Sequence, residues 1–168
     1  MERTPLSQVL KMGLILALTH LTSSQTTSDK NQWSWISGTN TGEVGGVYGT
    51  QGTPSTMNYP GGRRAHQMVF VASINCSFMF GGYGRTQSGA VGYLNDLWTY
   101  NVTSTEWSWL TGSKIANTRG IYGTLGSSST GYNPGSRSDF PMVYHPRLHV
   151  IYLYGGYGYD SAGTLGIE

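Results

Sequence analysis

The stretch Phe78-Met79-Phe80-Gly81-Gly82-Tyr83-Gly84 decides the fold, because it occurs twice. It returns as Tyr152-Leu153-Tyr154-Gly155-Gly156-Tyr157-Gly158, 74 positions later when Gly81 is aligned with Gly155. Each copy begins with aromatic and aliphatic residues, which favour a buried strand. Glycine reaches positive φ without steric cost, so we expect the double glycine to end the strand in a sharp turn. The chain is therefore predicted to consist of repeated strand-and-turn units.

The composition favours an all-β protein with many turns. The chain has 168 residues, enough for one domain or two small ones. Only 11% of its residues are charged, whereas it contains 25 glycines and 12 tyrosines. The net charge of +2 is small and its basic residues are scattered, which excludes nucleic acid as the expected partner.

Residues 1–24 have the pattern of a secretory signal. Arg3 and Lys11 precede the apolar run 12–18, and small polar residues follow at 22–24. The run is shorter than the roughly 20 apolar residues of a membrane span, so no span is predicted. An amphipathic or buried helix is the alternative interpretation. We expect cleavage near Ser24, a short N-terminal segment at 25–32 and an extracellular protein.

Two glycosylation patterns agree with export. Asn75-Cys76-Ser77 and Asn101-Val102-Thr103 are acceptor triplets, so Asn75 and Asn101 are candidate glycosylation sites. Both are predicted to lie in turns, where a bulky sugar is tolerated. Cys76 is the single cysteine, and its counterpart in the second copy is Val150. We therefore interpret Cys76 as a small apolar strand residue.

The repeat is longer than the two glycine motifs. Residues 33–94 align with residues 107–168 without a gap, and about 22 of the 62 pairs are identical. Apolar runs bounded by turn residues predict strands at 67–72, 77–80, 96–101 and 106–110. Long inserts at 39–62 and 113–135 separate the units, and the repeated Tyr48 and Tyr122 predict that these inserts pack down. The paired tryptophans are expected in the core: Trp33 with Trp107, and Trp35 with Trp109.

The order of these markers resembles a kelch repeat, in which each motif forms one four-stranded blade of a β-propeller. The resemblance implies that the double glycine closes the second strand. It places a tyrosine and a tryptophan on the third and fourth strands. The markers in the first unit are Pro60, Gly61, Arg63, His66, Gly81, Gly82, Leu94, Asn95, Asp96, Leu97, Trp98, Tyr100 and Trp107.

The resemblance covers residues 33–168, as an incomplete propeller. One complete blade is expected at about 63–112, preceded by a last strand at 32–37. A partial blade at 137–168 carries Arg137, Gly155 and Gly156. Because kelch propellers usually have five to seven blades, we expect an N-terminal fragment of a longer protein, whose remaining blades close the propeller. Assembly from several copies is the alternative.

No residue pattern predicts catalysis, a cofactor or a metal site. His145 and His149 are separated by Pro146, Arg147 and Leu148, which favours a turn, and zinc takes three or four ligands. His66 is replaced by Phe140 in the second copy, which indicates packing. Arg63 and Asp96 are interpreted as structural partners beneath the loops.

The expected function is that of a secreted or cell-surface scaffold that binds protein or glycan without catalysis. Segments that differ between the copies are the expected binding surface: 40–45, 53–59, 85–88, 115–119, 131–133 and 159–162. The resemblance also extends to the propeller domain of galactose-oxidase-like secreted copper oxidoreductases. Their tyrosine and histidine ligands and their tyrosine–cysteine crosslink match no positions of this chain.

Overall fold

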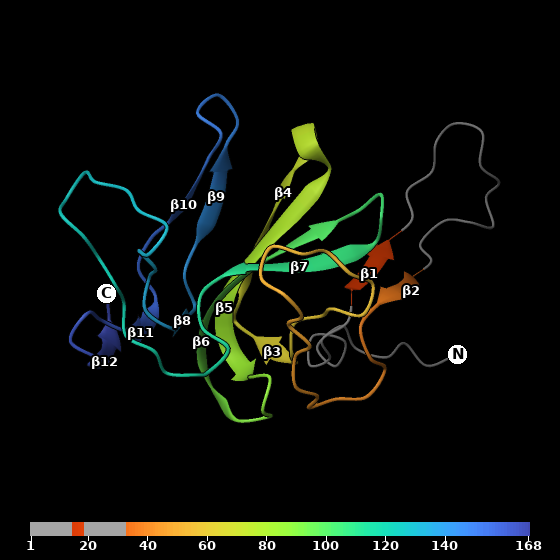
Figure 1. Cartoon of the computed structure of the whole chain (residues 1–168), viewed down its shortest axis with the longest axis horizontal. Coiled ribbons are helices and arrows are strands. Elements are labelled where there is room, and N and C mark those ends of the chain that lie inside the picture. Colours follow the sequence, from red (N-terminus) through yellow and green to blue (C-terminus); the bar gives the residue numbers. More distant parts are fainter. Residues whose placement is uncertain (1–14, 19–32) are drawn as a thin grey trace.

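The computed structural model describes residues 15–18 and 33–168 of the chain, and within them it is all-β. Its strands pair antiparallel, and the one helical element within residues 15–18 and 33–168 is a single 3-10 turn at Ala72–Ile74 (Figure 1). The predicted fold class, all-β, is confirmed. Among the described residues, no helix has the length and apolar character that crossing a membrane requires.

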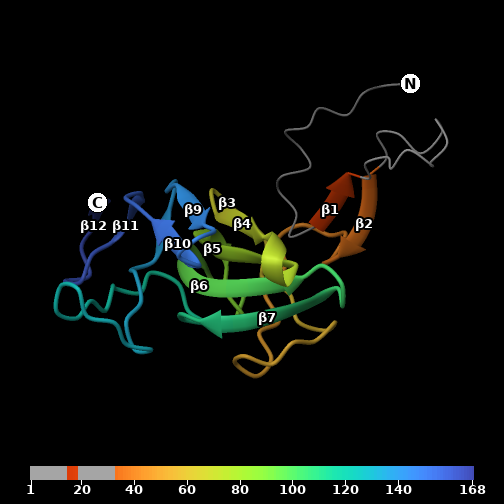
Figure 2. The same cartoon turned by 90° about the horizontal axis from the view of Figure 1, so that it is seen from above.

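A meandering sheet occupies the middle of the molecule (Figures 1 and 2). It contains β3 (Arg63–Arg64), β4 (Gln67–Val71), β5 (Cys76–Arg85), β6 (Val91–Asn101) and β7 (Glu106–Thr111). β3 and β4 both pair with the same edge of β5, and β6 and β7 follow in order on the other side. The four predicted strands are confirmed, but the second and third are longer than predicted.

In the first unit the double glycine does not end the second strand, so that prediction was wrong there. In the second unit the strand Val150–Leu153 (β10) ends before Gly155 and Gly156, as predicted. Gly81 and Gly82 have φ values of 60° and 96°, and the register of β5 against β6 shifts between Phe80 and Gly82. The pair therefore forms a bulge, and β5 continues to Arg85. A Cβ on Gly82 would lie 2.6 Å from the Arg64 carbonyl oxygen, so this position excludes larger residues.

The second unit repeats the first from β3 to the start of β6, with two shorter strands at the positions of the single strand β5. It contains β8 (Arg137–Ser138), β9 (Met142–His145), β10 (Val150–Leu153), β11 (Tyr157–Tyr159) and β12 (Leu165–Ile167). Arg63 pairs with Gly84, and 74 positions later Arg137 pairs with Gly158. The duplication seen in the sequence is thus reproduced in the strand registers.

The two units meet along β4 and β9. The Asp139 amide donates a hydrogen bond to the Ala65 carbonyl oxygen at 3.1 Å, and the Phe80 and Phe140 rings meet edge to face at 5.6 Å. Ala65 and Asp139 are equivalent residues, and both have positive φ, 53° and 57°. The same backbone kink therefore breaks the first strand in each unit.

The first insert packs down, as predicted, but residues 121–132 of the second insert are all exposed, so the prediction was wrong there. Val47 bridges to Tyr59 in the first insert, and Ile121 bridges to Asn133 at the equivalent place in the second. Tyr48 is fully buried, whereas Tyr122 is 52% exposed. The core of the first unit contains Tyr48, Met79, Trp98, Tyr100, Trp107 and Trp109.

The N-terminal strands stand apart from the central sheet. β1 (Ile15–Leu18) pairs with β2 (Trp33–Ser37). Trp33 and Trp35 are exposed and do not belong to the core of the first unit, so the expectation that both tryptophan pairs are buried is wrong for this half. The rest of the predicted signal and residues 25–32 lie outside the described residues.

Candidate functional site

A buried ion pair joins β3 to β6 in the first unit. The Arg63 guanidinium donates hydrogen bonds to both Asp96 carboxylate oxygens, at 2.6 and 2.7 Å. It also donates to the carbonyl oxygens of Gly61 and Gly81. Tyr48 Oη and Trp98 Nε1 complete the set by donating to Asp96 Oδ2 at 2.6 and 2.7 Å.

The surroundings of this network keep the Asp96 carboxyl ionised and the Tyr48 hydroxyl protonated. Burial alone raises the pKa of the Asp96 carboxyl, but the Arg63 charge and the hydrogen bonds from Arg63, Trp98 and Tyr48 hold it below its ordinary value. Burial and then the Asp96 charge raise the pKa of Tyr48. Since both side chains are satisfied and almost fully buried, the pair holds strands together.

Other residues of the repeated motif in the first unit lie around this network. Tyr100 stands opposite Trp107 across β6 and β7, with ring centroids 5.1 Å apart. Trp98 packs against Tyr48 with centroids 4.7 Å apart. His66 lies behind the Gly82 bulge, and its Nδ1 atom is buried and has no hydrogen-bond partner in the part of the chain that the structure describes. Burial and the nearby Arg63 charge lower the pKa of His66 to about 4.

In the second unit Arg137 repeats the contacts of Arg63. It donates to the carbonyl oxygens of Gly135 and Gly155, each at 3.0 Å. Its carboxylate partner is Glu168, and its guanidinium also donates to Tyr122 Oη at 2.9 Å. Gly155 and Gly156 take positive φ, as Gly81 and Gly82 do.

The other histidines and the cysteine have local partners. His149 Nδ1 lies 2.8 Å from Tyr144 Oη, and His145 Nδ1 accepts from the Leu148 amide. Both lie at the β9–β10 turn, as predicted. Cys76 is half-buried at the start of β5, opposite Val71 and Asn101. Within residues 33–168, no three histidine, cysteine, aspartate or glutamate side chains gather as a metal site would require.

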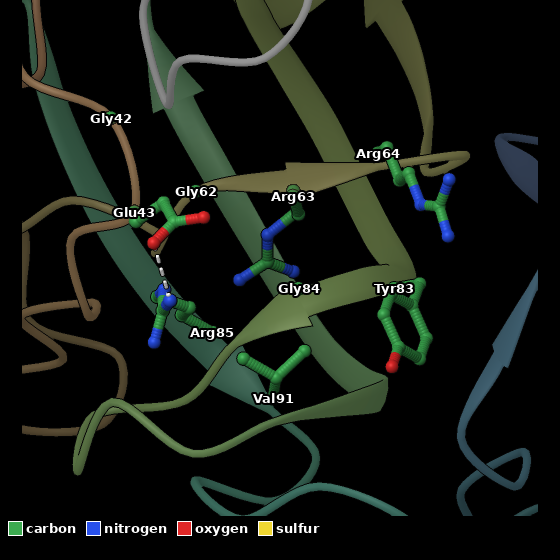
Figure 3. A pocket seen from close by; sticks show the side chains of 9 residues that line it. All are labelled: Gly42, Glu43, Gly62, Arg63, Arg64, Tyr83, Gly84, Arg85 and Val91. Atoms are coloured by element: carbon green, nitrogen blue, oxygen red, sulfur yellow. Dashed lines mark hydrogen bonds and ion pairs between the residues drawn. The ribbon is translucent and has the colours of Figure 1, made fainter.

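An open cleft lies at the C-terminal end of β5 (Figure 3). Its volume is about 480 Å³, and its lining is Gly42, Glu43, Gly62, Arg63, Arg64, Tyr83, Gly84, Arg85 and Val91. Glu43 accepts a hydrogen bond from Arg85 at 2.9 Å on one side, and Arg64 and Tyr83 lie on the other. The Arg64 guanidinium lies over the Tyr83 ring, 5.2 Å from its centroid.

A second hollow continues from this cleft to the second unit. Its volume is about 370 Å³, and it shares Arg64 and Tyr83 with the cleft and adds Ala65, Tyr93, Ser138 and Asp139. Tyr93 stacks against Tyr83 at 5.1 Å and against Tyr157 at 5.7 Å, edge to face or tilted. The cleft and the hollow share Arg64 and Tyr83 and together form one surface, which we call the arginine–tyrosine cleft.

This cleft joins two of the segments that differ between the copies. Glu43 belongs to the segment 40–45 and Arg85 to the segment 85–88, and their side chains form an ion pair across the cleft. Within 115–119, Asn117 instead bonds to the Tyr93 backbone at the start of β6. Sequence reasoning missed Arg64. Its signal was the change to Ser138 in the second copy beside the repeated Arg63 and Arg137.

The two glycosylation candidates lie at the other end of the sheet. Asn75 occupies the turn before β5 with φ 51°, and Asn101 ends β6. Asn75 Nδ2 donates to Thr103 Oγ1 at 2.6 Å, so the two triplets are neighbours. Because β5 runs from this end to the arginine–tyrosine cleft, sugars here would leave the cleft open.

Comparison with known protein families and with curated protein sequences returns no match.

Proposed function

We propose that this chain is a segment of a secreted kelch-type β-propeller that binds protein or glycan as a non-catalytic scaffold. The meandering unit of β3/β4, β5, β6 and β7, with its repeat, supports the blade assignment. Arg63, Asp96, Tyr100 and Trp107 act in it as structural residues, since their side chains are enclosed and pair with one another.

The observation that carries the binding role is the arginine–tyrosine cleft. Its size lies in the range of small-ligand sites. Its side chains offer guanidinium donors from Arg64, carboxylate acceptors from Glu43 and Asp139, and tyrosine rings. Sugar hydroxyls both donate and accept hydrogen bonds, and sugar ring faces pack on aromatic side chains. Of the two ligand classes, these groups favour a glycan.

The test is saturable binding of the full chain to a panel of immobilised oligosaccharides. Arg64→Ala and Tyr83→Ala are expected to weaken the strongest interaction at least about tenfold, because each removes a contact in the cleft. Arg147→Ala, which changes an exposed arginine in the β9–β10 turn, is the matched control. Replacing 39–45 by a Gly-Ser linker is expected to abolish binding. Binding that survives all three changes would refute the assignment.

A further inference from the structure

A second surface carries an inference that is independent of the glycan proposal. In the second unit, β10 pairs with β9 on one side, and among the described residues no strand pairs with its other edge (Figure 1). In the first unit, the equivalent edge of β5 is covered by β6. A groove of about 460 Å³ lies along the open edge, lined by Tyr122, Pro134, Arg137, Ile151, Tyr152, Leu153, Tyr154, Gly155 and Glu168.

Three residues of this groove, Tyr122, Leu153 and Tyr154, have buried counterparts in the first unit. Tyr48, Met79 and Phe80 are at most 5% exposed there, whereas Tyr122 is 52% and Tyr154 is 81% exposed. The counterpart of Met79 is Leu153. Because the two units share their strand registers, the side chains that cover Tyr48, Met79 and Phe80 indicate which side chains would fit the second unit. The equivalent positions there are Tyr122, Leu153 and Tyr154.

In the first unit, β6 covers Tyr48, Met79 and Phe80. Trp98 stands opposite Met79, Leu97 stands opposite Phe80, and Tyr100 stands opposite Ser77. The Asp96 carboxylate accepts from Arg63 and from Tyr48. A strand in the groove would therefore place a tryptophan opposite Leu153, a leucine opposite Tyr154 and an aspartate at Arg137.

The charge in the groove agrees with this occupant. The Arg137 side chain is almost fully buried, and Glu168 reaches it from the position equivalent to Leu94. A glutamate side chain thus supplies the carboxylate that an aspartate supplies in the first unit. An incoming aspartate would replace Glu168 with the two-oxygen geometry that Asp96 shows.

We propose that the open edge of β10 is an acceptor site for an extended strand with the pattern Asn-Asp-Leu-Trp-x-Tyr. The strand adds antiparallel to β10 through backbone hydrogen bonds, and its aspartate binds Arg137. The partner is a segment of this stated chemistry, and the residues that select it are Arg137, Tyr122 and Leu153.

The test is binding of a synthetic peptide with the sequence of residues 95–111 to the monomeric fraction of the full chain, measured by fluorescence anisotropy. Saturable one-to-one binding is expected. The same peptide with Asp96→Ala should bind at least about tenfold more weakly, because the carboxylate of a buried pair is lost. No saturable binding of the unmodified peptide would overturn the proposal.

Three protein variants distinguish binding at this site from non-specific adhesion. In Arg137→Ala the two peptides should bind equally, since the partner of the aspartate is gone, and a persistent difference would overturn the assignment of Arg137. Leu153→Glu should weaken binding by blocking the tryptophan position. Val143→Glu makes the same change on β9, outside the groove, and should not. Equal effects of these two variants would also contradict the proposal.

Discussion

The Arg63 guanidinium and the Asp96 carboxylate face each other as two planar groups, with hydrogen bonds of 2.6 and 2.7 Å. They are 33 positions apart and both side chains are almost fully buried. Arg63 lies on the short strand that precedes the kink, and Asp96 lies on β6, with β5 between them. The pair therefore bridges a strand in addition to the backbone ladder.

Asp96→Ala is expected to reduce the free energy of unfolding by about 3–5 kcal/mol, because it leaves a buried arginine without its counter-charge. Urea denaturation followed by tryptophan fluorescence measures this change. Glu43→Ala removes the partner of Arg85 from an exposed pair and should cost less than about 1 kcal/mol. Equal costs would show that Asp96 is not held in a buried pair.

Stability is expected to fall as the pH drops from about 6.5 to about 4, partly because of His66. Its pKa in the folded chain is about 4, lowered by burial and then by Arg63, against about 6.5 when unfolded. The unfolded chain therefore binds more protons in this window, which favours unfolding by up to about 3 kcal/mol.

His66→Phe copies the residue of the second unit, Phe140, and should flatten this part of the stability curve. Thermal unfolding between pH 7 and pH 4 measures the slope. An unchanged slope in His66→Phe would assign the pH dependence to other groups.

Gly82→Ala should destabilise the chain more than Gly89→Ala, by at least about 1 kcal/mol. Both glycines have positive φ, 96° and 85°, so the backbone strain is similar. Only Gly82 is crowded, because its new Cβ would meet the Arg64 carbonyl oxygen and His66, whereas Gly89 has no atom within 4 Å. Comparable melting temperatures would contradict the bulge geometry.

Tyr48→Phe should cost about 1.5–3 kcal/mol, because Tyr48 donates a buried hydrogen bond to a charged group. Tyr122→Phe, at the equivalent position, should cost about 1 kcal/mol or less. Its hydroxyl accepts from Arg137 and lies on a half-exposed ring, where water can replace it. Denaturation of the two variants compares the units directly.

Expression through a secretory pathway should yield a chain carrying N-linked sugars at Asn75 and Asn101. Asn75→Gln and Asn101→Gln should each remove one sugar, seen as a mass shift that glycosidase treatment abolishes. Retention of an unmodified chain inside the cell would contradict both the signal and the acceptor predictions.

The sequence predicted the central sheet well, because its strands are set by local apolar runs and by the repeat. It predicted poorly where distant segments decide the structure. The double glycine forms a bulge because β6 continues to pair beyond it, as Gly84 pairs with Gly92. Whether Trp33 is buried depends on which segment packs over β2, and the residues of β2 alone do not determine that. Likewise, Arg64 became part of a candidate site only because the insert brought Glu43 to the same end of β5.

The shared registers of the two units also make the molecule a natural scaffold for grafting. Glu43, Arg64 and Arg85 have the equivalents Asn117, Ser138 and Tyr159, and Glu43 and Asn117 even share a left-handed backbone, with φ 62° and 61°. Exchanging these three side chains would thus transfer the charged groups of the cleft to equivalent positions of the other unit. The two units could be engineered to bind two different ligands, or to bind the same ligand at both sites and so gain avidity.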